Sequence, residues 1–372
     1  MKVALELQPC CGNRSGIGTY AYELAKRLTA EDGLEFCGNL FNFAGRNDNS
    51  QSLGEIAIPV RESKVFPYGV YRRIWNWAPI PYQRLFPGKA DLTVFFNYIV
   101  PPCIGGRVIT TIHDMTWLRF PETMDRRNLR RLREGMDRSI LRSDHILTIS
   151  QFSKQEIVNL LDVPEERISI VPCAPSLSGD VEDFARCAGK FHLTKPYLLY
   201  LGTIEPRKNL VRLLNAYSLL KKEQGIAHQL VLAGGRGWES EEIYWTAEDT
   251  DGVVFTGYLT AAEKNALYQN AAAFVFPSLY EGFGIPPLEA MSLGCPVVCA
   301  NTASLPEVVG DAARLVDPLD EADIAQGIWD VISNRKYATR LVSLGYQQAE
   351  KYTWTASAKK FREVCLAVLE GS

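Results

Sequence analysis

Short apolar runs recur along the whole chain, and longer segments with helical periodicity separate them. The runs lie at KVALEL (2–7), LEFCGNLF (34–41), DLTVFF (91–96), RVITTIH (107–113), HILTIS (145–150), ISIVP (168–172), 196–202, 229–235, 253–258, 272–278 and 296–301. Continuous apolar runs are typical of parallel strands buried on both faces, because helices cover each side of such a sheet. The pattern therefore predicts an α/β fold with two doubly wound, Rossmann-like parallel sheets.

A break in this pattern divides the chain into two parts. Residues 174–195 contain Pro, Ser and Gly and show neither a strand pattern nor clear periodicity, so we predict a linker there. The first domain is expected to span residues 1–180 and the second residues 190–353. The last segment, 354–372, has apolar residues at helical spacing and predicts an amphipathic helix that needs a partner surface.

Composition and charge narrow the class of protein. A chain of 372 residues exceeds the size at which a single core stops growing, and 47% hydrophobic with 22% charged residues is typical of a folded protein. With 40 basic and 43 acidic residues the formal net charge is −3, and no dense lysine tract is present. Binding to nucleic acid is therefore not expected.

The N-terminus and the cysteines bear on the cellular compartment. The first apolar run is too short for a signal peptide, and no apolar run approaches the length of a membrane span. The nine cysteines are odd in number and show no Cys-x-x-Cys pair. We therefore expect a cytoplasmic protein with reduced thiols, without disulfides or a zinc site.

A glycine-containing segment, SGIGTYA (15–21), follows the first predicted strand and opens a helix. Gly16 and Gly18 would let backbone N–H groups approach a phosphate or a sugar at the helix N-terminus. The segment also fits the dinucleotide fingerprint, which would favour an NAD-dependent oxidoreductase. The connection from Gln8 to Ser15 is longer than that tight turn allows, so a substrate-facing loop is the preferred interpretation. An ordinary helix-start turn is the remaining alternative.

Two further segments place polar groups at predicted strand ends, where ligands bind in open α/β sheets. His113, followed by Asp114, ends the run at 107–113, although a lone histidine at such a place more often makes a structural contact. Arg207 and Lys208 lie in GTIEPRKN (202–209), just before a predicted helix. Two adjacent cations there can neutralise a diphosphate, and a solvated turn is the alternative.

The most informative segment is PSLYEGFGIPPLEAM (277–291). Glu281 is expected just past a strand, and Glu289 is expected in the first turn of a helix that Pro286 and Pro287 begin. Glu289 could then bind vicinal hydroxyls, while the turn at 282–284 exposes backbone N–H groups. A surface pair of carboxylates is the alternative, but it leaves the turn unexplained.

These segments, together with SLPEVVGDA (304–312), occur in the order typical of one family, and the chain resembles the retaining glycosyltransferases of family four over nearly its whole length. The resemblance implies a GT-B fold, in which two Rossmann-like domains face a cleft. Within the family the chain looks most like bacterial mannosyltransferases of polysaccharide and O-antigen assembly. Cys10-Cys11, before the glycine segment, departs from the pattern.

The resemblance also implies roles for the donor-side residues. Arg207 and Lys208 would hold the donor diphosphate, and Glu289 would hold the nucleotide ribose. Glu281 would contact hydroxyls of the donor sugar with the help of the Phe283 and Gly284 backbone. Because the two cations can stabilise the leaving diphosphate, neither a metal nor another cofactor is expected.

On the acceptor side, the resemblance places His113 beside the 6-hydroxyl of the transferred sugar. Gly16 and Gly18 would shape the phosphate and acceptor side of the cleft. The helix at 354–372 would cross back onto the N-terminal domain. Retention of configuration would follow from a same-face displacement in which the leaving phosphate deprotonates the acceptor.

Two segments bear on the acceptor. The first, YRRIWNW (71–77), mixes cations with aromatic residues, and the second is an arginine-rich predicted helix at 125–144. Such surfaces can rest on anionic lipid headgroups and present a lipid-diphosphate acceptor, so peripheral contact with the inner face of the membrane is one interpretation. A solvated helix face with a packed aromatic cluster is the other.

The sequence thus favours a hexosyltransferase that uses a nucleotide-diphosphate sugar, with GDP-mannose as the preferred donor and a glycan or lipid-linked acceptor in cell-surface polysaccharide synthesis. A UDP-sugar donor is the alternative within this class. An NAD-dependent oxidoreductase and a catalytically silent glycan-binding protein are the alternatives from other classes.

Overall fold

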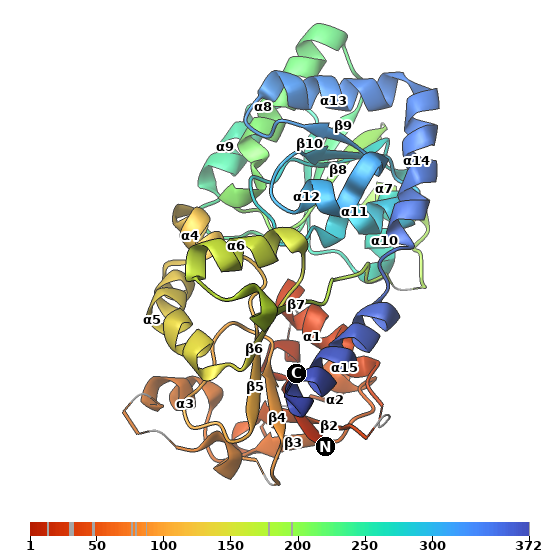
Figure 1. Ribbon diagram of the computed structural model, residues 1–372. Helices are drawn as coiled ribbons and strands as arrows, with labels where there is room; N and C mark the ends of the chain where they lie inside the picture. The colour runs from red at the N-terminus through yellow and green to blue at the C-terminus, as the bar shows by residue number, and fades with distance from the viewer. Residues whose placement is uncertain are drawn as a thin grey trace. The chain divides into compact units, whose positions relative to one another are not determined.

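The computed structural model describes residues 1–12, 15–29, 33–46, 49–75, 77–78, 80–86, 88–177, 179–194 and 196–371. The chain forms two compact units. The first consists of Met1–Met115, Arg126–Cys173 and Thr353–Ser372, and the second of Thr116–Asp125 and Ala174–Tyr352. Each unit has its own parallel sheet flanked by helices (Figure 1).

The first unit is built on a seven-stranded parallel sheet with the strand order β3-β2-β1-β4-β5-β6-β7. Its strands are β1 (Lys2–Glu6), β2 (Glu35–Phe41), β3 (Val60–Ser63), β4 (Leu92–Phe95), β5 (Arg107–Thr111), β6 (His145–Thr148) and β7 (Ile168–Ile170). Its α-helices are α1 (Gly16–Lys26), α2 (Ser50–Leu53), α3 (Tyr68–Ile74), α5 (Arg126–Arg142), α6 (Gln151–Leu161) and α15 (Trp354–Glu370). Chain order reverses between the neighbouring strands β1 and β4, which makes their carboxyl ends the topological switch point.

The second unit repeats this plan with a six-stranded parallel sheet in the order β10-β9-β8-β11-β12-β13. Its strands are β8 (Tyr197–Leu201), β9 (Gln229–Ala233), β10 (Val253–Gly257), β11 (Ala273–Phe276), β12 (Val297–Ala300) and β13 (Ala313–Val316). Its α-helices are α4 (Thr116–Arg119), α7 (Phe184–Lys190), α8 (Leu210–Gln224), α9 (Glu241–Glu248), α10 (Ala261–Asn270), α11 (Ile285–Ser292), α12 (Leu305–Val309), α13 (Glu321–Ser333) and α14 (Arg335–Ala349). Here the switch point lies between β8 and β11.

The two parallel sheets confirm the predicted α/β class, and every predicted strand is present. The sequence pattern missed β3 and β13. Both strands lie at a sheet edge and are partly exposed, so neither has the continuous apolar run of a central strand. The segment 174–195 was predicted to lack an element but contains α7, whose N-terminus the Asp183 side chain caps. Residues 178 and 195 of that segment lie outside the described residues.

The segment Thr116–Asp125 groups with the second unit, although it lies within the predicted first domain of residues 1–180. Two contacts explain the grouping. The Phe120 ring lies 5.5 Å from the Tyr280 ring, and Trp238 Nε1 donates a hydrogen bond of 2.5 Å to the Thr123 carbonyl. Sequence proximity to α5 therefore does not decide which core this segment joins.

The terminal helix α15 packs on α1 and belongs to the first unit. The Phe361 ring is fully buried and lies 6.4 Å from the Phe36 ring and 5.9 Å from the Phe96 ring. Trp354 makes an edge contact of 6.1 Å with Tyr20, and Ser357 Oγ donates to the Pro172 carbonyl at 2.8 Å. The amphipathic pattern of the sequence thus finds its partner surface in the first unit.

Replacement of Phe361 by alanine should destabilise the first unit by about 3 to 5 kcal/mol, because a buried ring is lost and the cavity between Phe36 and Phe96 closes only partly. Equilibrium urea unfolding of the variant measures this change. Glu363→Ala, on an exposed position of the same helix, is the matched control and should change stability by less than about 0.5 kcal/mol. Equal unfolding midpoints for the two variants would contradict the described packing.

Candidate active site

Two loops meet at the switch point of the second sheet. The first follows β8 and contains the 3₁₀ helix η6 (Pro206–Lys208), and the second follows β11. Asn209, which has a left-handed backbone (φ 61°), donates through Nδ2 to the carbonyls of Pro277 (3.1 Å) and Pro318 (2.6 Å). The Leu279 amide donates to the Arg207 carbonyl at 2.9 Å. These bonds fix the two loops against each other.

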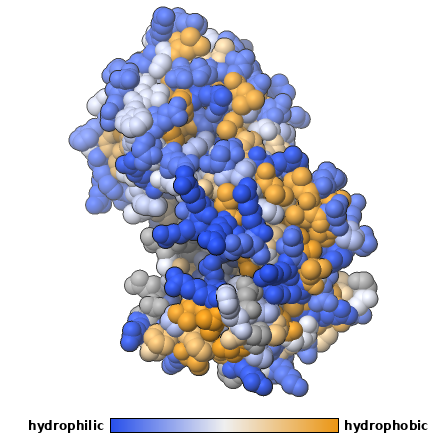
Figure 2. Space-filling view, turned by 90° about the vertical axis from the view of Figure 1, so that its left-hand side faces the viewer, coloured by the Kyte–Doolittle hydropathy of each residue, from blue (hydrophilic) through white to orange (hydrophobic). Residues whose placement is uncertain are grey.

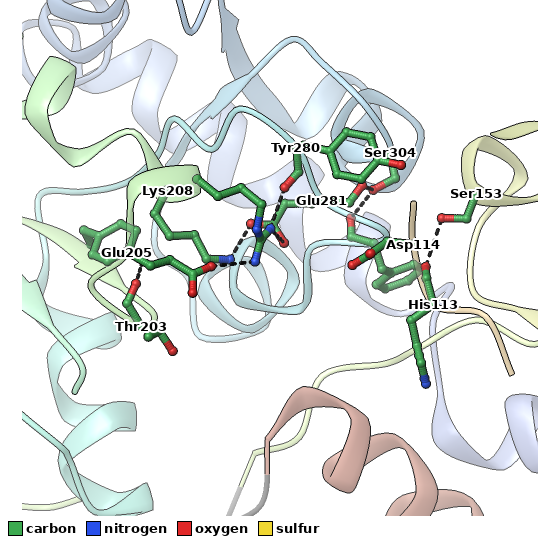
Figure 3. A network of polar contacts seen from close by, with 12 residues as sticks. His113, Asp114, Ser153, Thr203, Glu205, Lys208, Tyr280, Glu281 and Ser304 are labelled. Atoms are coloured by element: carbon green, nitrogen blue, oxygen red, sulfur yellow. Dashed lines mark hydrogen bonds and ion pairs between the residues drawn. The ribbon is translucent and has the colours of Figure 1, made fainter. Parts of the chain in front are cut away.

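The loops bring the predicted residues Arg207, Lys208 and Glu281 into one charged network (Figure 3). Lys208 Nζ lies 2.5 Å from Glu281 Oε1, and Arg207 Nη1 lies 3.0 Å from Glu281 Oε2. Arg207 Nη2 also pairs with Glu205 Oε1 at 2.7 Å, and Nη1 donates to the Tyr280 carbonyl at 2.6 Å. The side chains of these four charged residues are between 3% and 15% exposed, so the alternative of a solvated turn is wrong.

The charge state of Glu281 follows from this network. Burial alone would raise its pKa, but the neighbouring Arg207 and Lys208 outweigh burial and lower the pKa to about 2. Glu281 is therefore a carboxylate at every physiological pH. It can accept hydrogen bonds, from sugar hydroxyls among others, but it cannot donate a proton.

A tight turn carries the backbone from Glu281 to α11. Gly284 has φ 110°, and a Cβ atom at this position would lie 2.7 Å from Leu305 Cδ2, so the turn requires glycine. Ser304 Oγ lies 2.9 Å from the carbonyls of both Glu281 and Phe283. The Phe283 ring is buried against Tyr352. The role of Ser304 could not be predicted from the sequence, because only the folded loop shows what its hydroxyl binds.

Glu289 lies deeper than expected. Helix α11 begins at Ile285, which makes Glu289 its fifth residue rather than a member of the first turn. The residue is 5% exposed, and Oε1 accepts a 2.7 Å bond from Lys264 Nζ of α10. Burial raises its pKa, although Lys264 opposes the shift. Both carboxylates of the segment are thus paired and mostly buried, which corrects the alternative of a surface pair, and Lys264 is a partner that the sequence did not reveal.

His113 follows β5 in the first unit and is 6% exposed. Its Nε2 lies 2.7 Å from the Phe96 carbonyl, which can only accept, so Nε2 carries the hydrogen and Nδ1 keeps its lone pair in the neutral ring. Burial lowers the pKa of His113 and favours this neutral form. Edge contacts with Tyr20 (5.2 Å) and Tyr98 (5.6 Å) fix the orientation of the ring.

The glycine segment opens α1 as predicted. Ser15 Oγ accepts a 3.4 Å bond from the Gly18 amide, so Ser15 caps the helix and this amide is not presented to a ligand. A Cβ atom on Gly16 would meet no atom within 4 Å, which leaves open space beside it. The connection from β1 contains the 3₁₀ helix η1 (Gln8–Cys10) and is no dinucleotide-type tight turn. Asn13 and Arg14 lie outside the described residues.

Among the described residues, no helix is long and apolar enough to cross a bilayer. In the same part of the chain, no group of three or more His, Cys, Asp and Glu side chains could hold a metal ion.

Comparisons with known proteins agree with the fold. Residues 14–177 match the family model described as Glycosyltransferase Family 4, and residues 182–348 match Glycosyl transferases group 1. The O-antigen chain mannosyltransferase B of Escherichia coli is 32% identical over 95% of this chain and 96% of its own length.

Among solved structures, the sucrose-phosphate synthase of Thermosynechococcus elongatus superposes with a TM-score of 0.73 at 17% identity and full coverage of both chains. Anabaena HepE in complex with UDP and glucose superposes with a TM-score of 0.72 at 16% identity, covering 99% of this chain and 100% of that one. Both are glycosyltransferase-type folds that share the two-sheet plan described above.

Fold and site together define a glycosyltransferase with two Rossmann-like units of the GT-B type. The chain belongs to glycosyltransferase family 4, as its N-terminal family model and its full-length relative show. The resemblance inferred from the sequence motifs is therefore confirmed.

The pairing of Glu281 predicts a specific response to acid. Because the folded-state pKa is lowered from 4.5 to about 2, Glu281 contributes stability above pH 4.5, and this contribution is lost as the pH falls from 4.5 toward 2. Glu281→Gln should destabilise the second unit by about 3 kcal/mol at pH 7, because two mostly buried cations lose their partner. Thermal unfolding of both proteins between pH 2.5 and pH 7 should show the gap narrowing below pH 4.5. A constant gap would contradict the ion pair.

Proposed function

We propose that this glycosyltransferase is a retaining, metal-independent mannosyltransferase that uses GDP-mannose and extends a glycan or lipid-linked acceptor in cell-surface polysaccharide synthesis. The observation that carries the site assignment is the pair of cations, Arg207 and Lys208, fixed at the switch point of the second sheet. The choice of mannose is supported by the full-length likeness to an O-antigen mannosyltransferase.

The donor diphosphate would bind to Arg207 and Lys208. When the bond from the anomeric carbon to the diphosphate oxygen breaks, negative charge accumulates on the leaving group. Cations already held in place stabilise this charge without reorganisation, which is where preorganised electrostatics contribute most. We therefore assign to these two side chains the work that a divalent cation performs elsewhere. The leaving phosphate itself would take the proton of the acceptor hydroxyl on the same face of the sugar.

The remaining donor contacts follow from the described hydrogen-bonding states. Glu281, which stays ionised, would accept bonds from hydroxyls of the donor sugar, and the Phe283–Gly284 backbone would line the same side. Glu289, held through Oε1 by Lys264, would bind the ribose hydroxyls. In the first unit, His113 Nδ1 would accept a bond from the 6-hydroxyl of the sugar, because its Nε2 hydrogen is already donated to Phe96.

The donor assignment is tested by a panel of nucleotide sugars. The wild type should release nucleoside diphosphate from GDP-mannose faster than from UDP-sugars, and EDTA should leave the rate unchanged. A preference for a UDP-sugar would contradict GDP-mannose as the donor. Binding of NAD without any sugar transfer would favour the oxidoreductase alternative. Binding of glycan without turnover of any donor would favour a catalytically silent protein.

Arg207→Ala and Lys208→Ala should each lower kcat/KM by about 10²- to 10³-fold with every accepted donor, because the diphosphate is common to all of them. Lys336→Ala, which removes an exposed cation from α14 of the same unit, is the matched control and should leave the rate unchanged. The measurement is initial-rate kinetics with unfolding curves recorded in parallel. A variant that only switched donor preference would contradict the diphosphate role.

The basic surface of the first unit supports membrane contact. Five arginines of α5 are exposed, at positions 126, 127, 130, 133 and 138, and the exposed Arg73 and Trp77 lie at and just after α3. Figure 2 shows the side of the molecule on which α5 lies, where strongly hydrophilic side chains gather. Asn76, part of the predicted basic-aromatic segment, lies outside the described residues. Exposed arginines of this kind are attracted to anionic headgroups by about 1 kcal/mol each.

A triple variant with Arg126, Arg130 and Arg133 changed to serine should therefore bind less well to vesicles containing anionic phospholipid. The loss should be about tenfold or more at low salt and should shrink as salt is raised. The matched control changes Arg335, Lys336 and Arg340 of α14 to serine. Cosedimentation with anionic and with purely zwitterionic vesicles measures the effect. Equal binding of both triple variants to the anionic vesicles would contradict membrane contact through α5 and favour the alternative of a solvated helix face.

A further inference from the structure

The first sheet has a polar cluster at its own switch point that the donor chemistry does not use. Glu6 ends β1 and pairs in register with Asn39 of β2 and Phe95 of β4, and Asn97 lies two residues beyond the end of β4. Glu6 is 4% exposed, and its Oε1 accepts a 3.2 Å bond from the Gln8 amide. The corresponding place in the second sheet holds Arg207, Lys208 and Glu281. Ligands of open α/β sheets bind at this position.

Two half-buried arginines face this cluster from different helices. Arg131 of α5 donates through Nη2 to Asn97 Oδ1 at 3.1 Å, and its buried Nε has no hydrogen-bond partner among the described residues. Arg72 of α3 lies over the Tyr68 ring, 5.6 Å from its centre. Both guanidinium groups interact electrostatically with Glu6 and with each other. Two positive charges are therefore close together in a partly desolvated place.

Neither arginine is neutralised by a carboxylate of the described chain. Arg107 and Arg130, by contrast, pair with Asp144 and Glu134 at 2.7 Å. The nearby Glu6 does not supply the missing charge, because burial raises its pKa to about 8 against the opposing effects of the Gln8 amide, Arg131 and Arg72. At neutral pH Glu6 is mostly an uncharged acid that can donate its O–H. Desolvated like charges are unfavourable unless an anion joins them.

We propose that Arg72 and Arg131, with Asn97 and Glu6, bind an anionic group of the phosphate class carried by the acceptor. The proposal rests on the glycosyl-transfer function proposed above and names the substrate group that the first unit recognises. Guanidinium groups bind phosphate oxygens through paired N–H donors, and Asn97 fixes the orientation of Arg131 for this contact. A neutral acceptor would leave the two cations without a counter-charge, so the cluster selects for a charged acceptor.

Direct binding is measured by titration calorimetry with inorganic pyrophosphate in the presence of saturating GDP, which occupies the proposed donor site. Arg131→Gln and Arg72→Gln should each weaken pyrophosphate binding at least tenfold. Arg107→Gln, on an exposed position at the opposite end of the same sheet, is the matched control and should bind pyrophosphate like the wild type. The affinity of Arg131→Lys, which keeps the charge but loses the paired donors, should lie between those of Arg131→Gln and the wild type. Equal affinity of Arg131→Gln and Arg107→Gln in proteins with native unfolding curves would overturn the proposal.

Kinetics distinguish a phosphate on the acceptor from free phosphate in solution. The two acceptors are a short prenyl-diphosphate-linked sugar and the neutral alkyl glycoside of the same sugar. Arg131→Gln should raise the KM of the charged acceptor about tenfold and leave the KM of the donor and of the neutral acceptor unchanged. Pyrophosphate binding without this change in KM would show that the site takes free phosphate and would overturn its acceptor role. Absence of turnover by the wild type with any nucleotide sugar would refute the proposed function, while the calorimetry would still decide the anion site.

The Glu6 side chain gives an independent readout. As the pH rises through about 8, Glu6 ionises and its negative charge should repel the bound anion. The groups that face it are the Gln8 amide, Arg72 of α3, Arg131 of α5, the Tyr68 and Tyr82 side chains and the Cys11 thiol. Pyrophosphate binding to the wild type should therefore weaken several-fold between pH 7 and pH 9 relative to Glu6→Gln, which lacks the titrating proton. Parallel pH profiles for the two proteins would remove Glu6 from the proposed site.

Discussion

The placement of two cations beside one ionised carboxylate at the switch point of the second sheet is the constraint on which the rest of this unit depends. Arg207 and Lys208 are mostly buried, and a buried cation is costly unless it is paired and hydrogen-bonded. Glu281 meets this requirement only if the loop after β11 is held against η6. Asn209 ties the two loops together, and Ser304 fixes the turn after Glu281. The conformation of both loops is thus a consequence of the charge balance.

Both units have a switch point in a parallel sheet, but the charges at the two switch points are balanced differently. In the second unit the switch point carries two cations and two carboxylates, and the described contacts pair them with one another. In the first unit the switch point carries Arg72 and Arg131, while the carboxyl of Glu6, which lies near them, is held mostly neutral by burial. A self-neutralised site can exist without ligand at little cost. A site with unmatched cations is completed only by an anion from outside, which is why the two clusters are assigned different ligands.

Much of the fold could be predicted from the sequence because apolar runs of the right length specify buried parallel strands whatever surrounds them. The same rule placed Arg207 and Lys208, and separately Glu281, just after predicted strands, where ligands of open sheets bind. That these side chains form one ion-paired network is seen only in the folded unit. The rule could not predict β3 or β13, because polar residues interrupt the short sequences of these two partly exposed edge strands, so neither has a continuous apolar run. Nor could it predict that Lys264 binds Glu289 or that Ser304 fixes the turn. Those contacts join elements that only the tertiary packing brings together.

The charged network also explains how a donor could bind without dismantling the site. An ammonium group has three N–H donors, and Glu281 accepts one of those of Lys208 among the described contacts. The network of Arg207, Lys208, Glu205 and Glu281 has no formal net charge, so the added charge of a diphosphate needs compensation. The N-termini of α8 and α11 both lie beside this network, and their backbone N–H groups contribute partial positive charge. Glu281, which stays ionised, would then be best matched by neutral hydroxyls, and under the proposed function this separation of partners would orient the phosphates toward the cations and the sugar toward the carboxylate.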